Sequence, residues 1–417
     1  MSSPISKIQT NNQKLVEYIL TFQPLFAVPI YFSILVNNPL LWVSLIIAVI
    51  PLGLRFWLNR CFVQRTPFDV PILLYILGML VGLVVAPNKE VALGALSSTL
   101  ASILIYYGIV SNSEKGNKYW LWMTGIICVI TLLMSIWFFS QGNGRQLFFN
   151  QWAFKLFEGL PRTSLSLQMH SLGALLSVIL PPLFAIAWFR NNTHLRIGAL
   201  VLGVIFLAIL FLSASGNGWI AVICGLAVVL ICWRLWMIGI VVPVLGLTAS
   251  AVVVFYDEAE WLAQSLSVSS LLGRVELWSQ TVPLLTNYHI ITGIGLGSWF
   301  EIYNNRYNVN QVHVHNTYLQ LYTDTGILGG LACIIAVVVF LQLSVNILRA
   351  SKQTPWYGVA VGFIGAIVAG AVFGCFDVTT TVTIVTATGY IYLSVPLLWV
   401  WAALFVVAHK HLNGQKY

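Results

Sequence analysis

Apolar segments long enough to cross a lipid bilayer recur along this chain, and they constrain its fold more than any other feature. A helix needs about 20 residues to cross about 30 Å of hydrocarbon. Of the 417 residues, 59% are hydrophobic and only 8% are charged, whereas soluble domains carry about 25% charged residues. Such a chain cannot cover itself with polar groups, so lipid must be its main solvent.

We predict an all-α polytopic membrane protein with about twelve transmembrane helices. The predicted spans are 19–36, 39–56, 69–86, 91–110, 119–140, 167–189, 195–213, 218–233, 235–255, 321–347, 356–376 and 382–408. The first span lacks a small-residue cleavage site, so we expect a retained helix and not a signal peptide. Residues 1–254 then form an N-terminal transmembrane bundle, 255–320 a periplasmic loop carrying the candidate active site, and 321–417 the C-terminal transmembrane helices.

The net charge of +8 is explained by the orientation of the chain in the membrane. With both termini in the cytoplasm, most lysines and arginines lie inside, as the positive-inside rule predicts. The basic residues left outside are Lys89, Arg145, Lys155, Arg162, Arg274 and Arg306. The outer acidic residues are Glu90, Glu158, Asp257, Glu258, Glu260, Glu276, Glu301, Asp324 and Asp377. Binding to nucleic acid is not needed to explain the charge, and we expect none.

Two outer segments, 141–166 and 256–320, interrupt the series of spans. The second, at about 65 residues, is far longer than a structureless connection. Its many aromatic residues argue against disorder, so we expect short amphipathic helices lying against the bundle. Within the spans, charged and histidine residues occur near the ends, among them Asp69, His170, Arg196 and Asp324. Ion-coupled transporters usually need charges near the midplane, and this bundle has none there.

The strongest local signal for chemistry lies where the second outer segment re-enters the membrane, at His313, His315, Asn316 and Tyr318. A histidine at the membrane boundary can be neutral near pH 7 and accept a proton from a hydroxyl. Asn316 or the Tyr318 hydroxyl could hold the imidazole in one tautomer. Alternatively, both histidines are simply interfacial polar residues. A metal site would need a third ligand, and none falls at close spacing, so we expect no metal.

Arg274 is the outer arginine best suited to a phosphate or pyrophosphate, which a guanidinium binds through paired, charge-assisted hydrogen bonds. The alternative is pairing with Glu276 or with a lipid headgroup. Arg162 could join Arg274 in an anion pocket, whereas each outer arginine taken singly is also compatible with surface solvation. Nearby, the glycines at 293, 295 and 297 match a loose dinucleotide fingerprint without any strand context, so we expect a tight turn there.

These motifs, in this order, resemble the O-antigen ligase and polymerase superfamily of bacterial envelope glycosyltransferases. The matching elements are Gly273, Arg274 and Trp278, then Gly293, Gly295 and Gly297, then His313, His315, Asn316, Thr317 and Tyr318, then Thr325 and Gly326. Weaker matches lie at 65–69 and 169–173. Family members commonly carry a Ser-Arg-Gly-Ala motif at an outer helix end. Here the corresponding run starts at Ser215, and Gly216 stands where the arginine is expected.

The resemblance implies a metal-independent transfer of glycan from an undecaprenyl-diphosphate-linked donor, without a cofactor, on the periplasmic side of the bacterial inner membrane. The acceptor would be a glycan, lipid or protein hydroxyl. His315 would be the general base, and Arg274 would stabilise the diphosphate leaving group. The expected substrate-binding residues are Arg162, Asn316, Tyr318, His313 and Arg306. The alternatives are a membrane protein associated with solute or inorganic-carbon transport and a non-catalytic scaffold.

Overall fold

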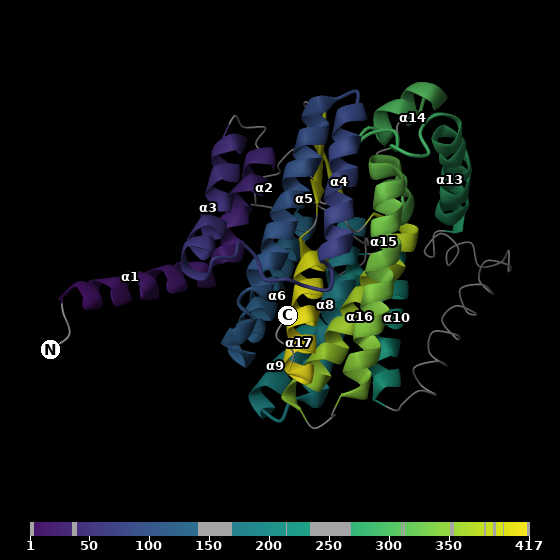
Figure 1. Ribbon diagram of the computed structural model, residues 1–417. Helices are drawn as coiled ribbons and strands as arrows, with labels where there is room; N and C mark the ends of the chain where they lie inside the picture. The colour runs from purple at the N-terminus through teal and green to yellow at the C-terminus, as the bar shows by residue number, and fades with distance from the viewer. Residues whose placement is uncertain are drawn as a thin grey trace.

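The structure is a computed structural model that describes residues 4–35, 40–140, 169–213, 215–233, 268–309, 311, 313–350, 354–378, 381–386, 389–394 and 396–414. In this part of the chain, long helices form a bundle with one β-hairpin (Figure 1). Seven of its helices are long and apolar enough to cross a membrane. They are α3 (Leu41–Asn59), α5 (Lys89–Val110), α6 (Asn117–Ser140), α8 (Met169–Phe189), α9 (Thr193–Leu212), α15 (Thr317–Arg349) and α16 (Pro355–Phe376).

Three shorter apolar helices complete the bundle: α4 (Asp69–Val85), α10 (Gly216–Cys232) and α17 (Leu397–Asn413). The prediction of a largely helical, multi-pass membrane protein is therefore confirmed, although its count of twelve helices is not. The predicted first span, 19–36, is wrong as a single helix. After α1 (Pro4–Thr21), the chain forms a short 3₁₀ helix, η1 (Gln23–Ala27), and then α2 (Val28–Leu35). Prolines at the starts of η1 and α2 explain the break, since proline fits a first helical turn but not an interior. The predicted span 235–255 and outer segment 141–166 lie outside the described residues.

The predicted last span, 382–408, is wrong over its first half. Residues Thr381–Thr386 form strand β1, which pairs antiparallel with β2 (Gly389–Ser394) in a register that places Thr386 opposite Gly389. Both strands are rich in threonine, valine, isoleucine and tyrosine, which lose side-chain freedom in a helix and favour strands. The helix α17 starts only after this hairpin, which lies beside α5 (Figure 1).

The helices α8, α10 and α16 pack extensively against one another, and small residues allow their close approach. A Cβ atom added at Gly225 on α10 would lie 2.7 Å from the backbone oxygen of Gly365 on α16. Such close contact through small residues is a common way for membrane helices to associate, because lipid removes the hydrophobic driving force between them. On another side of the bundle, α4 packs along α15 (Figure 1).

α15 is broken at Gly326, which has φ 61° and ψ −149°. In an unbroken helix the carbonyl of Thr323 would accept a hydrogen bond from the Ile327 amide. Here the Thr323 carbonyl accepts from the Ile294 amide at 2.8 Å, and the Ile327 amide donates to the Ile291 carbonyl at 3.0 Å. The loop 291–297 thus supplies the hydrogen bonds that the break removes, which matters because unpaired backbone groups are costly in a membrane.

This loop is the tight turn that the glycines predicted, with Gly293, Gly295 and Gly297 all at positive φ. Its position is fixed further by the amide of Gly297, which donates to Asp324 Oδ1 at 3.2 Å. The amide of Leu296 also donates to the Gly82 carbonyl on α4 at 3.1 Å. Glycine tolerates these backbone angles, which L-residues with a Cβ rarely adopt.

The segment 256–320, which we predicted to be an outer loop, contains the helices α13 (Val268–Tyr288) and α14 (Trp299–Tyr307) in its described part. They lie at the end of the bundle where α15 begins (Figure 1). The two helices share a small hydrophobic core of their own, which includes Leu277, Trp299 and Val314. The residues before α15 are therefore packed between helices.

We predict that Gly326→Ala lowers the free energy of unfolding by about 2 kcal/mol or more. A backbone with φ 61° and ψ −149° is adopted almost only by glycine, and it costs another residue about 1–3 kcal/mol. The new Cβ would also overlap the carbonyl oxygen of Ile291. Thermal unfolding of the full chain in detergent micelles measures the effect. Gly198→Ala on α9 is the control, because a Cβ there meets nothing within 4 Å. Equal melting temperatures for Gly326→Ala and wild type would contradict the role of the break.

Candidate active site

The site is organised by the residues that begin α15. Asn316 caps this helix, since its side-chain oxygen accepts hydrogen bonds from the amides of Tyr318 and Leu319, both at 3.0 Å. Its side-chain nitrogen donates to the Cys375 carbonyl at 3.2 Å, and the Tyr318 hydroxyl donates to the Ala371 carbonyl at 2.8 Å. Both side chains thus fasten the start of α15 to the end of α16.

This attachment places Asp377, the residue after α16, against both histidines. His313 Nε2 lies 2.9 Å from Asp377 Oδ1, and His315 Nδ1 lies 3.3 Å from the same oxygen. The two imidazole rings are 4.1 Å apart between centroids. The backbone of the aspartate is held as well, because the Thr317 hydroxyl donates to its carbonyl at 3.0 Å. The carboxylate facing the imidazoles is therefore Asp377, whereas the polar ends of Asn316 and Tyr318 hold backbone groups.

The residue between the histidines is fixed from both sides. Trp278 Nε1 on α13 donates to the Val314 carbonyl at 2.9 Å, and the Val314 amide donates to Gln320 Oε1 at 3.4 Å. His315 itself adopts a left-handed backbone conformation with φ 52°. Such a conformation is strained for a non-glycine residue and persists only where the surroundings impose it. The clamp on Val314 supplies that constraint.

Arg274 lies one helical turn before Trp278 on α13 and is buried, with 7% of its surface exposed. Its Nη1 donates to Asn217 Oδ1 at 3.2 Å. Asn217 sits in the first turn of α10, whose N-cap Ser215 accepts a hydrogen bond from the Gly218 amide at 3.3 Å. Among the described residues, Arg274 forms no salt bridge. The alternative of pairing with Glu276 is thus not what the structure shows.

The charges of these groups influence one another. Burial lowers the pKa of the His315 imidazole, and the neighbouring His313 and Arg274 lower it further, while contact with Asp377 acts in the opposite direction. Burial alone would raise the pKa of the Asp377 carboxyl, but its contacts with the two histidines outweigh burial and hold that pKa well below its usual range. The site therefore combines a neutral imidazole, an ionised carboxylate and a guanidinium that stays charged.

The ionised carboxylate favours the tautomer of His315 with the proton on Nδ1. Nε2 is then the ring nitrogen that carries no proton, and an unprotonated ring nitrogen can accept a proton from a hydroxyl. An aspartate that orients an imidazole in this way is a common arrangement for a general base. Chemically, the cluster can deprotonate a hydroxyl while the Arg274 guanidinium neutralises a developing negative charge.

The remaining predicted substrate-binding residues are placed differently. Arg306 lies in the last turn of α14, exposed, with its guanidinium 5.9 Å from the ring centroid of the neighbouring Tyr307. No described contact joins Arg306 to the histidines. Arg162 lies outside the described residues, so its predicted role stays a prediction.

Sequence reasoning missed Asp377 and Asn217. Asp377 was noted only as one of many outer acidic residues, although its position directly after an apolar span was a usable signal. Asn217 follows Gly216, the position where the resemblance led us to expect an arginine. Neither residue is near His315 or Arg274 in the sequence, so spacing alone did not connect them.

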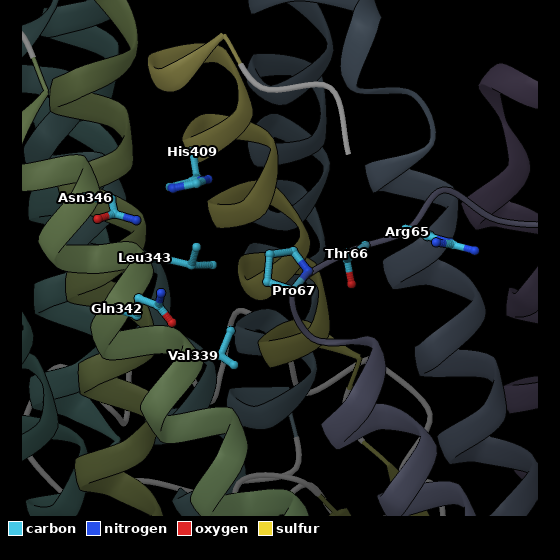
Figure 2. Close-up of a pocket in the computed structure, with 8 residues that line it drawn as sticks. All are labelled: Arg65, Thr66, Pro67, Val339, Gln342, Leu343, Asn346 and His409. Carbon is cyan, nitrogen blue, oxygen red and sulfur yellow. The ribbon is translucent and has the colours of Figure 1, made fainter.

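A pocket of about 540 Å³ lies elsewhere, between α15, α17 and the residues before α4 (Figure 2). Val339, which lines this pocket, lies roughly 33 Å further along α15 than Thr317, at 1.5 Å per residue. The pocket is therefore near the opposite end of α15 from the histidines. Its lining residues are Arg65, Thr66, Pro67, Val339, Gln342, Leu343, Asn346 and His409.

Comparison with protein families identifies part of this chain. Residues 201–334 match the family model described as O-antigen ligase. This confirms the resemblance to that family. The matched segment includes Arg274, Asn217 and both histidines of the cluster. Asp377 lies beyond the segment, so the structure adds to the site a residue that the match does not cover. No curated protein matches the chain.

We predict that Trp278→Phe lowers the free energy of unfolding by about 1–3 kcal/mol. The substitution keeps the aromatic ring but removes the indole N–H, and a buried carbonyl left without its donor costs about that much. Val314 is fully buried. Thermal unfolding in micelles is the measurement, and Trp42→Phe on α3 is the control, because Trp42 is 66% exposed. Equal losses in the two variants would argue against the clamp.

Proposed function

We propose that this protein transfers a glycan from an undecaprenyl-diphosphate-linked donor to an acceptor hydroxyl at the outer face of the bacterial inner membrane. The observation that carries the proposal is the contact between His315 and Asp377 near a buried arginine, Arg274, whose charge acts on both groups. His315 and Arg274 lie within the segment that matches the O-antigen ligase family. Any glycan, lipid or protein hydroxyl that reaches His315 is a suitable acceptor for this chemistry.

In the proposed reaction, His315 Nε2 accepts the proton of the acceptor hydroxyl. The acceptor oxygen then forms a bond to the anomeric carbon of the donor sugar, and the bond between that carbon and the diphosphate oxygen breaks. A well-placed base contributes about 10²- to 10⁴-fold to the rate. Asp377 contributes by fixing the tautomer and by stabilising the imidazolium that forms.

The diphosphate leaves with the electron pair of the broken bond, and Arg274 is the group that we propose neutralises its charge. Burial strengthens this effect, because a guanidinium in a dry site interacts strongly with an anion. Arg274 has free donors for this purpose, since its one described side-chain partner is the neutral amide of Asn217. The adjacent first turn of α10 adds backbone amides that favour an anion.

The length of α15 supports a position at the membrane edge. The part of α15 from Ile327 to Arg349 is about 34 Å long at 1.5 Å per residue, enough to cross about 30 Å of hydrocarbon. The part before the break at Gly326, with the histidines at its start, would then lie beyond the hydrocarbon. A lipid-anchored diphosphate at the headgroup level can reach such a site without a channel. No observation favours the alternative of transport.

We expect His315→Ala to abolish the surface glycan that depends on this protein. In a strain lacking the protein, the variant copy should fail to restore that glycan, because transfer without the base is about 10²- to 10⁴-fold slower. His194→Ala, an exposed histidine on α9, is the control and should restore it fully. Full restoration by His315→Ala, at matched protein levels, would remove the proposal.

We expect Arg274→Ala to slow transfer about 10- to 100-fold, because a hydrogen bond to a charged group contributes about 1.5–3 kcal/mol. A second substitution, Gly216→Arg, should recover part of this loss by placing a guanidinium beside the same site. The position has room, since a Cβ at Gly216 meets nothing within 4 Å. The rate of lipid-linked glycan consumption by purified protein is the measurement.

Arg349→Ala, an exposed arginine at the far end of α15, serves as the control for loss of one positive charge. Equal rates for Arg274→Ala and Arg349→Ala would show that Arg274 does not serve the leaving group.

A further inference from the structure

Asp377 and the two histidines that face it are residues of types that bind metal ions. One nitrogen of His313, one nitrogen of His315 and one carboxylate oxygen of Asp377 all lie within 4.8 Å of one another. In the sequence, only the two histidines are close enough to each other to suggest ligands of one ion. The third group comes from the end of α16, brought there by the hydrogen bonds that join α16 to the start of α15.

We propose that His313, His315 and Asp377 bind one Zn²⁺ ion, and that the bound ion switches the site off. Two imidazoles and one carboxylate are a ligand set that zinc prefers, whereas Mg²⁺ and Ca²⁺ prefer oxygen ligands alone. A fourth position would be taken by water. The inhibitory part of this inference rests on the proposed transferase function, but the binding part does not.

The ligand atoms are held before any ion arrives. The left-handed backbone of His315 and the clamp on Val314 fix the two rings on the same side of the chain. Asp377 is held by the Thr317 hydroxyl on its carbonyl and by the Val378 amide, which donates to Oδ1 at 2.8 Å. Small shifts of the three side chains are then enough to open the space that an ion occupies.

The atom that His315 would use for zinc explains the inhibition. Its Nδ1 faces the carboxylate, so Nδ1 is the atom that zinc would bind. A neutral imidazole carries one ring proton, and zinc at Nδ1 therefore moves that proton to Nε2. No proton is lost, but Nε2 no longer has a lone pair to accept the proton of an acceptor hydroxyl. Zinc also takes the carboxylate that would stabilise the imidazolium.

The one cation that faces this cluster in the described residues is Arg274, whose charge opposes a second positive charge nearby. The negative charge of Asp377 offsets this repulsion. Repulsion by Arg274 and attraction by Asp377 together favour reversible binding of the ion over permanent binding. An inhibitory site requires reversible binding.

The test uses the full-length protein in detergent micelles, first stripped of metal with a chelator. Zn²⁺ binding is followed by calorimetry, and Co²⁺ is used as a visible probe because its absorption spectrum reports nitrogen and oxygen ligands in a four-coordinate site. We expect one ion per chain. His313→Gln and Asp377→Asn should each weaken binding about tenfold or more and remove the Co²⁺ absorption band. His194→Ala is the matched control and should change neither.

Transfer by the same preparations is measured with and without Zn²⁺. We expect zinc to inhibit the wild-type protein, a chelator to restore its activity, and whatever transfer His313→Gln retains to be insensitive to zinc. Equal binding by wild type and His313→Gln, or an equal loss in His194→Ala, would mean an adventitious ion only and would overturn the site. Zinc bound in wild type without inhibition would overturn the switch. Zinc binding without any transfer in the metal-free protein would retain the site but refute the proposed function.

Discussion

The contact of Asp377 with two imidazoles is the interaction on which the rest of the site depends. It joins the ends of two helices that are far apart in the sequence, it fixes which nitrogen of His315 is available, and it places a negative charge in a buried environment. Burying an isolated carboxylate would cost several kcal/mol. The histidines, the Val378 amide and the nearby positive charge of Arg274 together offset that cost.

Much of the fold follows from the sequence, because long apolar segments mark the parts of the chain that lie in lipid. The helices α3 to α6, α8 to α10 and α16 begin and end within a few residues of the predicted spans. The failures occurred where backbone chemistry overrides hydropathy. Prolines divide the first span, and β-branched residues turn the start of the last span into a hairpin. An apolar segment of suitable length can be any of these structures.

The site was only half predictable for a related reason. His315 and Arg274 were singled out from residue types suited to the chemistry; in the structure Arg274 lowers the pKa of His315, and their catalytic roles stay predictions. Asp377 and Asn217 were not found, because their contribution depends on which helix ends meet, and that is a long-range property of packing. The predicted role of Asn316 as an orienting group was reasonable for an amide beside an imidazole. In the structure, the side chain of Asn316 caps α15. The first backbone N–H groups of a helix have no partner within the helix, so a capping side chain often accepts their hydrogen bonds.

The break in α15 has a mechanical consequence. Both sides of the break are bonded to the loop 291–297, the earlier piece through the Thr323 carbonyl and the later piece through the Ile327 amide, and the loop is bonded to α4. Bilayers differ in thickness, and a long helix adapts by changing its tilt. Because the loop 291–297 holds both sides of the break, the two pieces of α15 and α4 would tilt together as one unit. The bonds of Asn316 and Thr317 to the end of α16 would then keep the histidines beside Asp377 in membranes of different lipid composition.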